Sequence, residues 1–175
     1  IRGQILKISH ITSNIKNDLF VLLYVSRNYI CKKAPMPIEF VYNTSFKLFN
    51  EAKVSSWLKL VVDSESFVLG ELVYAFFNDE DLRLLNKKHL NHDFYTDVLS
   101  FNSSENKTIN GNIAISIDRV KDNALKYNSN FEEEILRVMV HGLLHFMGFN
   151  DNTKELTAFM TQTEDDKIKM FHVEQ

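Results

Sequence analysis

Short apolar runs along the chain predict four β-strands. Ile38–Tyr42 (IEFVY) is rich in β-branched and aromatic residues and follows two prolines, which favours a strand. Leu69–Phe77 is a longer run, typical of a strand that is buried on at least one face. Two further strands are expected at Val98–Phe101 and Asn112–Ile117, with a polar loop between them.

Apolar residues three and four positions apart predict helices between and after these strands. Asn78 is expected to cap one of them, with Asp81 three residues on and Leu82, Leu84 and Leu85 on the inner side. The other helices are predicted over Glu51–Asp63, Asp118–Asn128, Phe131–Met147 and Lys154–Phe171. This order of elements, without internal repeats, predicts a single α+β domain around a central four-stranded mixed sheet.

Charge separates the first 35 residues from the rest. Residues 1–35 carry six basic residues and one acidic residue, whereas residues 36–175 carry 14 basic and 22 acidic residues. The apolar run Leu19–Val25 is far shorter than the about 20 residues that cross a bilayer, and no small-residue cleavage site follows it directly. We therefore expect residues 1–35 to be an extension outside the fold, residues 36–175 to form the domain, and neither to enter a membrane. The only cysteine, Cys31, excludes an internal disulfide and is compatible with the cytoplasm.

One predicted helix carries the motif HGLLHFMGFND at residues 141–151. His141 and His145 are four positions apart, so both imidazoles leave the helix on one side and can reach one ion. Gly148 is expected to end this zinc-hydrolase-like helix, because glycine takes the left-handed conformation without strain, and Asp151 can then turn back toward the ion. Two nitrogens, one carboxylate and an open fourth position are typical of a catalytic zinc site.

Each part of this motif also has a purely structural interpretation. A His-x-x-x-His pair on an apolar helix is often coincidental, and Asp151 could simply cap the helix expected from Lys154. Gly142 costs about 1 kcal/mol relative to alanine inside a helix, which indicates close approach either of a substrate or of another element. The pair, the glycine stop and the carboxylate at a suitable offset together favour a metal site.

The residue after the first histidine limits the chemistry. Metallopeptidases of the H-E-x-x-H type have a glutamate there, which takes a proton from metal-bound water, but this chain has Gly142. Peptide hydrolysis by that route is therefore disfavoured. Phosphodiester cleavage fits better, because an ion can stabilise negative charge on phosphate oxygens and lower the pKa of its bound water.

A second stretch, LNKKHLNHDFYTDVLSF at residues 85–101, reads as a helix end, a polar loop and a strand. Together with Gly111-Asn112-Ile113 and the histidine motif, it resembles the YbeY family of bacterial metal-dependent endoribonucleases. The resemblance covers about residues 36–171. The individual matches outside the histidine motif include Leu85, Asn86, Asp93, Thr96, Val98–Phe101, Met160 and Glu164.

The resemblance implies a metal site, an RNA substrate and a ribosomal partner. One Zn²⁺, or another divalent ion, would be held by His141, His145 and Asp151. The enzyme would cleave single-stranded rRNA in the cytoplasm, in maturation of the 16S rRNA 3′ end and in ribosome quality control. Its partner would be the ribosome or the small ribosomal subunit.

Three positions depart from the family pattern. Asp151 replaces the usual third histidine, and a carboxylate can still bind zinc. Leu90 stands in place of an arginine that is important for RNA cleavage, and His92 stands where a lysine is usual. The motif does not identify a general base; His89, His92 and Asp93 are candidates by their position in the loop, although such side chains are commonly only solvated.

Two other functions fit parts of the sequence. A metallopeptidase fits the histidine spacing but not Gly142. A non-catalytic ribosome-assembly factor with a structural metal fits Leu90 and the net charge of −8 over residues 36–175, since an acidic domain is a poor general binder of phosphates. An RNA-cleaving enzyme with this charge would keep its acidic residues away from the cleft or receive its RNA from a ribosomal partner.

Overall fold

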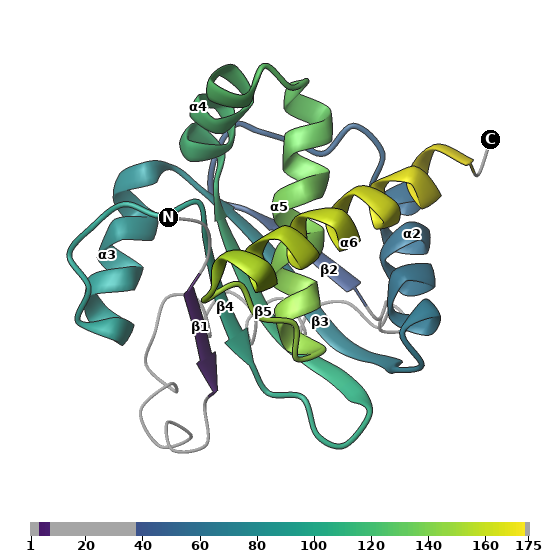
Figure 1. The fold of residues 1–175 in the computed structure, drawn as a ribbon. Coiled ribbons are helices and arrows are strands. Elements are labelled where there is room, and N and C mark those ends of the chain that lie inside the picture. The colour runs from purple at the N-terminus through teal and green to yellow at the C-terminus, as the bar shows by residue number, and fades with distance from the viewer. Residues whose placement is uncertain (1–3, 8–37, 174–175) are drawn as a thin grey trace, which may run out of the picture.

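Five strands form one mixed sheet in the computed structural model, which describes residues 4–7 and 38–173 (Figure 1). Their order across the sheet is β1-β4-β5-β3-β2. β4 and β5 run antiparallel, and the other three neighbouring pairs run parallel. The bounds are β1 (Gln4–Lys7), β2 (Ile38–Tyr42), β3 (Val68–Phe77), β4 (Val98–Asn102) and β5 (Thr108–Ser116).

Five helices accompany this sheet within the described residues. Figure 1 shows α5 crossing one face of the sheet, with α6 lying over α5. α5 contacts both β4 and β5, so its side chains face the centre of the sheet. The bounds are α2 (Glu51–Ser64), α3 (Asp79–Leu90), α4 (Ile117–Tyr127), α5 (Phe131–Phe146) and α6 (Lys154–Val173).

Side chains of β3 alternate between two apolar clusters, one on each face of the sheet. Tyr74 and Phe76 belong to the larger cluster, which α2 and α5 close. Ala75 and Phe77 belong to the smaller cluster, which α3 covers through Leu82. The histidine helix therefore lies on the face with the larger core, and the loop after α3 starts from the opposite face.

The predicted α+β class and the four predicted strands are confirmed. β5 begins four residues earlier than the predicted Asn112, because the residues from Thr108 onward also pair with β3. The prediction that Leu84 faces inward is wrong, since its side chain is 50% exposed. Residues two positions apart leave a helix on different sides, and Leu82 takes the inner one.

β1 is a fifth strand, which the sequence did not predict. Gln4–Lys7 pairs in parallel with Leu99–Asn102 of β4. For these four residues the expectation of an extension outside the fold does not hold, and Leu19–Val25 and Cys31 lie outside the described residues. No helix in the described part of the chain is long and apolar enough to cross a membrane.

α6 is fixed to α2 and α5 by polar contacts. Trp57 of α2 donates its indole N–H to the backbone oxygen of Lys167 at 2.7 Å, in a buried hydrogen bond. Lys167 in turn donates to the hydroxyl of Ser64 at 2.9 Å. On the other side, Arg137 of α5 pairs with Asp165 at 2.6 Å. These contacts determine where the α6 side chains that face α5 lie.

Deletion of residues 1–35 is expected to leave the domain folded, with its metal content unchanged. The two apolar clusters described above, and all the elements that carry the candidate site, lie within residues 38–173. Loss of the β1 edge pairing should lower the melting temperature by no more than about 5 °C, on the scale of 1 kcal/mol for each 2–4 °C. Calorimetry and metal analysis of the full and the shortened chain test this, and a much larger drop would make residues 1–35 part of the fold.

Candidate metal site

The helix that carries the two histidines begins and ends with well-defined caps. The side chain of Asn130 accepts a hydrogen bond from the backbone N–H of Glu132 at 2.8 Å, and three glutamates occupy the first turn. Acidic residues there interact favourably with the positive end of the helix dipole. Met147 is the C-cap, and Gly148 follows with φ of 94°, as the sequence predicted for the turn that frees Asp151.

His141, His145 and Asp151 come together at the C-terminal end of α5. Their ligand atoms all lie within 4.8 Å of one another, and both histidines are buried. The two Nε2 atoms are 2.9 Å apart. Asp151 places one carboxylate oxygen 3.9 Å from Nε2 of His141 and the other 4.0 Å from Nε2 of His145. The group could hold a metal ion.

The hydrogen-bond partners of the two Nδ1 atoms indicate the tautomer of each imidazole, and therefore whether its Nε2 atom carries a lone pair. Nδ1 of His141 is 2.7 Å from a carboxylate oxygen of Glu164, and Nδ1 of His145 is 2.9 Å from the carbonyl oxygen of Phe149. A carbonyl or an ionised carboxylate only accepts, so both Nδ1 atoms carry the proton and donate. In a neutral imidazole the Nε2 atom then has a bare lone pair. Two lone pairs facing each other at 2.9 Å, beside a carboxylate, would repel each other unless a cation is bound there, so the group could hold a metal ion, and these donors suit a zinc-type ion.

A metal ion fits this place better than an extra proton. Burial, and secondly the neighbouring His141, lower the pKa of His145 below its ordinary value. The neutral form of this imidazole is therefore favoured near pH 7, and the neutral form is the one that binds metals.

Asp151 is not used as the cap of the following helix. That role belongs to Thr153, whose hydroxyl accepts a hydrogen bond from the backbone N–H of Leu156 at 3.2 Å. Asp151 contributes only its backbone oxygen there, which accepts from the hydroxyl of Thr157 at 2.8 Å. The Asp151 carboxylate is thus left to face the two histidines.

Gly142 is explained by packing against the sheet. A Cβ atom at this position would lie 3.0 Å from Cγ2 of Ile113 on β5 and 3.1 Å from Oγ of Ser100 on β4. A longer side chain would therefore crowd these two sheet residues. Gly142 itself has no side chain that could act as a general base beside His141, which opposes the peptidase alternative.

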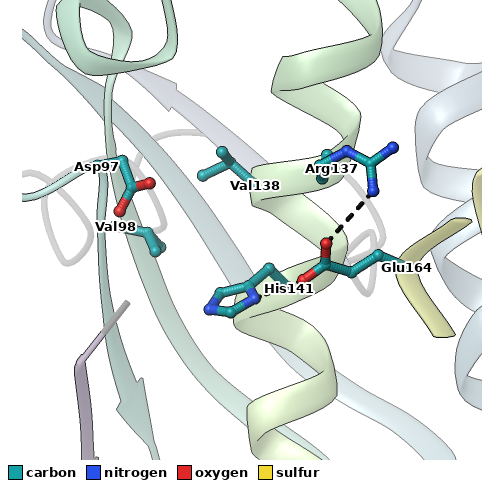
Figure 2. A pocket seen from close by; sticks show the side chains of 6 residues that line it. All are labelled: Asp97, Val98, Arg137, Val138, His141 and Glu164. Carbon is teal, nitrogen blue, oxygen red and sulfur yellow. Dashed lines mark hydrogen bonds and ion pairs between the residues drawn. The ribbon is translucent and has the colours of Figure 1, made fainter. Parts of the chain in front are cut away.

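Three polar residues that the sequence did not single out for a role lie beside His141. Figure 2 shows a small cavity lined by His141, Glu164, Arg137 and Asp97, with Val98 and Val138. Burial opposes the charge of Arg137, but Asp165 and Glu164 outweigh that effect and raise the pKa of its guanidinium. Asp97 accepts a hydrogen bond from the side chain of Asn123 at 3.0 Å.

The three loop candidates for a general base have other contacts. The Asp93 carboxylate pairs with Lys87 at 2.7 Å and with Arg83, and the hydrogen bond from Lys87, followed by the charge of Arg83, lowers its pKa. His92 stacks on Phe94 with ring centres 5.3 Å apart. Neither His89, His92 nor Asp93 lines the cavity beside His141.

His89 and Leu90 pack inward from the end of α3. The His89 ring meets Phe101 edge-on at 5.7 Å, and burial, with the charge of Lys88 second, lowers the pKa of His89. Leu90 packs against the smaller apolar cluster. The position where the resemblance implies an arginine therefore holds a partly buried apolar side chain.

No spacing rule in the sequence could have identified Glu164 as a neighbour of the histidines, and only a weak one pointed to Arg137. Arg137 is four residues before His141 on α5 and so shares its face, which is a weak signal by itself. Glu164 is 23 residues beyond His141 and meets it only because α6 packs on α5. Asp97 directly precedes β4, and the packing of α5 on the sheet places it at the cavity beside His141.

Comparisons with known proteins agree with one family. The family model described as Endoribonuclease YbeY matches residues 40–172. The chain is 45% identical over 138 residues to the endoribonuclease YbeY of Flavobacterium johnsoniae, which covers 79% of this chain and 99% of the relative. It is 40% identical to that of Christiangramia forsetii, with 79% and 96% covered.

Similarity extends to more distant relatives and to a solved structure. The endoribonuclease YbeY of Chlorobaculum tepidum is 33% identical, with 74% of this chain and 94% of the relative covered. The solution structure of TM1509 from Thermotoga maritima has a TM-score of 0.57 at 27% identity and covers 77% of this chain and 88% of that one. The chain therefore belongs to the YbeY endoribonuclease family, whose members are hydrolases that cleave RNA internally.

Proposed function

We propose that this protein is a cytoplasmic metal-dependent endoribonuclease that cleaves single-stranded rRNA. Its role would be maturation of the 16S rRNA 3′ end and ribosome quality control, in association with the ribosome or its small subunit. One Zn²⁺, or a similar divalent ion, would be held by His141, His145 and Asp151. The observation that carries this proposal is that the two Nε2 atoms lie 2.9 Å apart, while both Nδ1 atoms face hydrogen-bond acceptors, the carboxylate of Glu164 and the carbonyl of Phe149.

The donor set supports a catalytic site more than a structural one. Three protein ligands leave a fourth position open, whereas structural zinc sites are closed by four. When bound, the ion would lower the pKa of a water molecule and stabilise the negative charge that develops on phosphate oxygens. The chain's own contribution is to fix both imidazoles through their Nδ1 partners and to hold Asp151 on the turn after Gly148.

Substrate choice separates this proposal from the two alternatives. The purified full chain is offered a single-stranded 16S rRNA 3′ fragment, the same fragment annealed to its complement, and an unstructured peptide. We expect cleavage of the single strand only. Cleavage of the peptide would instead favour a metallopeptidase. No cleavage of any substrate, with retained binding to small ribosomal subunits, would favour an assembly factor.

The Leu90 position tests whether the loop after α3 meets the RNA backbone. Leu90→Arg is expected to strengthen RNA binding and to steepen its salt dependence by about one phosphate contact. The variant should also lose roughly 1–3 kcal/mol of stability, because Leu90 packs on the smaller apolar cluster. Leu90→Gln is the control, since it loses the same packing without adding charge. Equal RNA affinity of the two variants across a salt series would show that this loop does not contact the RNA backbone.

A further inference from the structure

Glu164 is a buried carboxylate in contact with a candidate metal ligand. Its side chain is 1% exposed, and one oxygen lies 2.7 Å from Nδ1 of His141. The other oxygen lies 3.4 Å from the guanidinium of Arg137, as the dashed line in Figure 2 marks. A buried carboxylate is costly unless it is paired and hydrogen-bonded, and Glu164 meets both conditions through these two neighbours.

The position of Glu164 is set by α6 as a whole. α6 is joined to α2 through the hydrogen bond from Trp57 to Lys167, only three residues beyond Glu164. It is joined to α5 through the 2.6 Å ion pair between Arg137 and Asp165, the next residue in the chain. Glu164 therefore reaches His141 from a helix that is held in place on two sides.

The two histidines differ in what holds them. His145 donates to the carbonyl of Phe149, a neutral acceptor in the turn that follows its own helix. His141 donates to a carboxylate on a different helix. A carboxylate partner fixes the tautomer and the ring orientation of an imidazole and makes its other nitrogen a stronger metal ligand, and such partners typically affect metal affinity by about 10–100-fold.

We propose that Glu164 is a positioning residue that sets the metal affinity of the site through His141, with Arg137 holding its second oxygen. The inference rests on the proposed metal site of His141, His145 and Asp151. A role for Glu164 only as the ion-pair partner of Arg137 is the weaker explanation of the contacts. Arg137 already has Asp165 at 2.6 Å, whereas its distance to Glu164 is 3.4 Å.

Zn²⁺ affinity of the full chain, measured by competition with a chromophoric chelator, tests this inference. Glu164→Ala removes the acceptor and is expected to weaken Zn²⁺ binding by about 10–100-fold. Glu164→Gln keeps an acceptor oxygen without the charge and should give a smaller loss. Asp165→Asn is the matched control, because Asp165 also pairs with Arg137 but lies outside the contacts of His141. The Zn²⁺ affinity of this variant should stay within about 3-fold of that of the original chain, which is below the loss expected when a carboxylate partner is removed.

The spectroscopic signature of His141 gives a second readout. In the Zn²⁺-loaded chain labelled with ¹⁵N-histidine, the Nδ1–H proton of His141 should be strongly deshielded by the carboxylate, and this shift should move upfield in Glu164→Gln but not in Asp165→Asn. If the original chain binds Zn²⁺ and Glu164→Gln and Asp165→Asn have the same affinity and the same His141 shift, Glu164 has no positioning role. If the original chain binds no Zn²⁺, the proposed metal site fails as well.

Discussion

Replacing Asp151 with alanine is expected to weaken Zn²⁺ binding by more than about 100-fold, beyond the loss typical for residues that only orient a ligand. The substitution leaves two imidazoles and removes the carboxylate that lies 3.9 Å from one Nε2 atom and 4.0 Å from the other. Asp151→Asn should be nearly as harmful, because a neutral amide is a weaker zinc ligand than a carboxylate. Asp151→His should retain binding, because imidazole suits zinc. Metal stoichiometry and chelator competition on the three variants measure these effects.

The asparagine variant separates ligation from capping. Asparagine caps helices about as well as aspartate, so a role for Asp151 in starting α6 would make Asp151→Asn nearly neutral in both stability and metal binding. The hydrogen bond from Leu156 to Thr153 already assigns that cap to Thr153. Thr153→Ala is the matched control and should lower stability by about 1 kcal/mol while leaving Zn²⁺ affinity unchanged. Wild-type Zn²⁺ affinity in Asp151→Asn would show that Asp151 is not a ligand of the ion.

Gly111→Ala is expected to lower the free energy of unfolding by about 3 kcal/mol or more, a large part of the stability of a typical domain. Gly111 has φ of 149°, which L side chains rarely adopt. A Cβ atom there would lie 2.4 Å from the backbone oxygen of Phe101 and 2.7 Å from the ring of Phe146, the last residue of α5. The strain would act where the histidine helix meets the sheet. Urea unfolding followed by circular dichroism measures the change.

Gly142→Ala is the comparison for that experiment. The three atoms nearest to a Cβ atom at position 142 are side-chain atoms of Ile113 and Ser100, at 3.0–3.3 Å. Alanine also gains about 1 kcal/mol of helix propensity over glycine, which offsets the tight contact. We therefore expect a change of less than about 1 kcal/mol. Equal losses in the two alanine variants would contradict the distinction between backbone strain and helix packing.

The sequence predicted most of the helices and strands, and that His141 and His145 leave one helix on the same side, because both depend on local spacing. Strands and helices follow from runs of apolar residues, and two residues four apart share a helix face in any fold. The turn after α5 was also predictable, since Gly148 adopts positive φ as expected. Asp151 then follows from chain reach, because only a short turn separates it from His145.

The rest of the site depends on how elements pack, which local spacing does not contain. Glu164 reaches His141 across 23 residues because α6 lies on α5, and Asp97 reaches the same cavity from the start of β4. The loop candidate Asp93 had an attractive position in the sequence, but its carboxylate pairs with Arg83 and Lys87 of α3. Ion pairs between a loop and the preceding helix are set by the exact course of the loop.

Zinc dependence of RNA cleavage is the most direct test of the metal-dependent nuclease. The full chain is stripped of metal with a chelator, dialysed, and titrated with Zn²⁺ while cleavage of a single-stranded 16S rRNA 3′ fragment is followed. His145→Ala, purified in the same way, controls for contaminating nucleases. We predict that the stripped chain does not cleave the RNA and that cleavage recovers completely at about one Zn²⁺ per chain, as expected for a single three-ligand site. His145→Ala should not recover cleavage. Full cleavage by the stripped chain, or by His145→Ala, would contradict the role of this site.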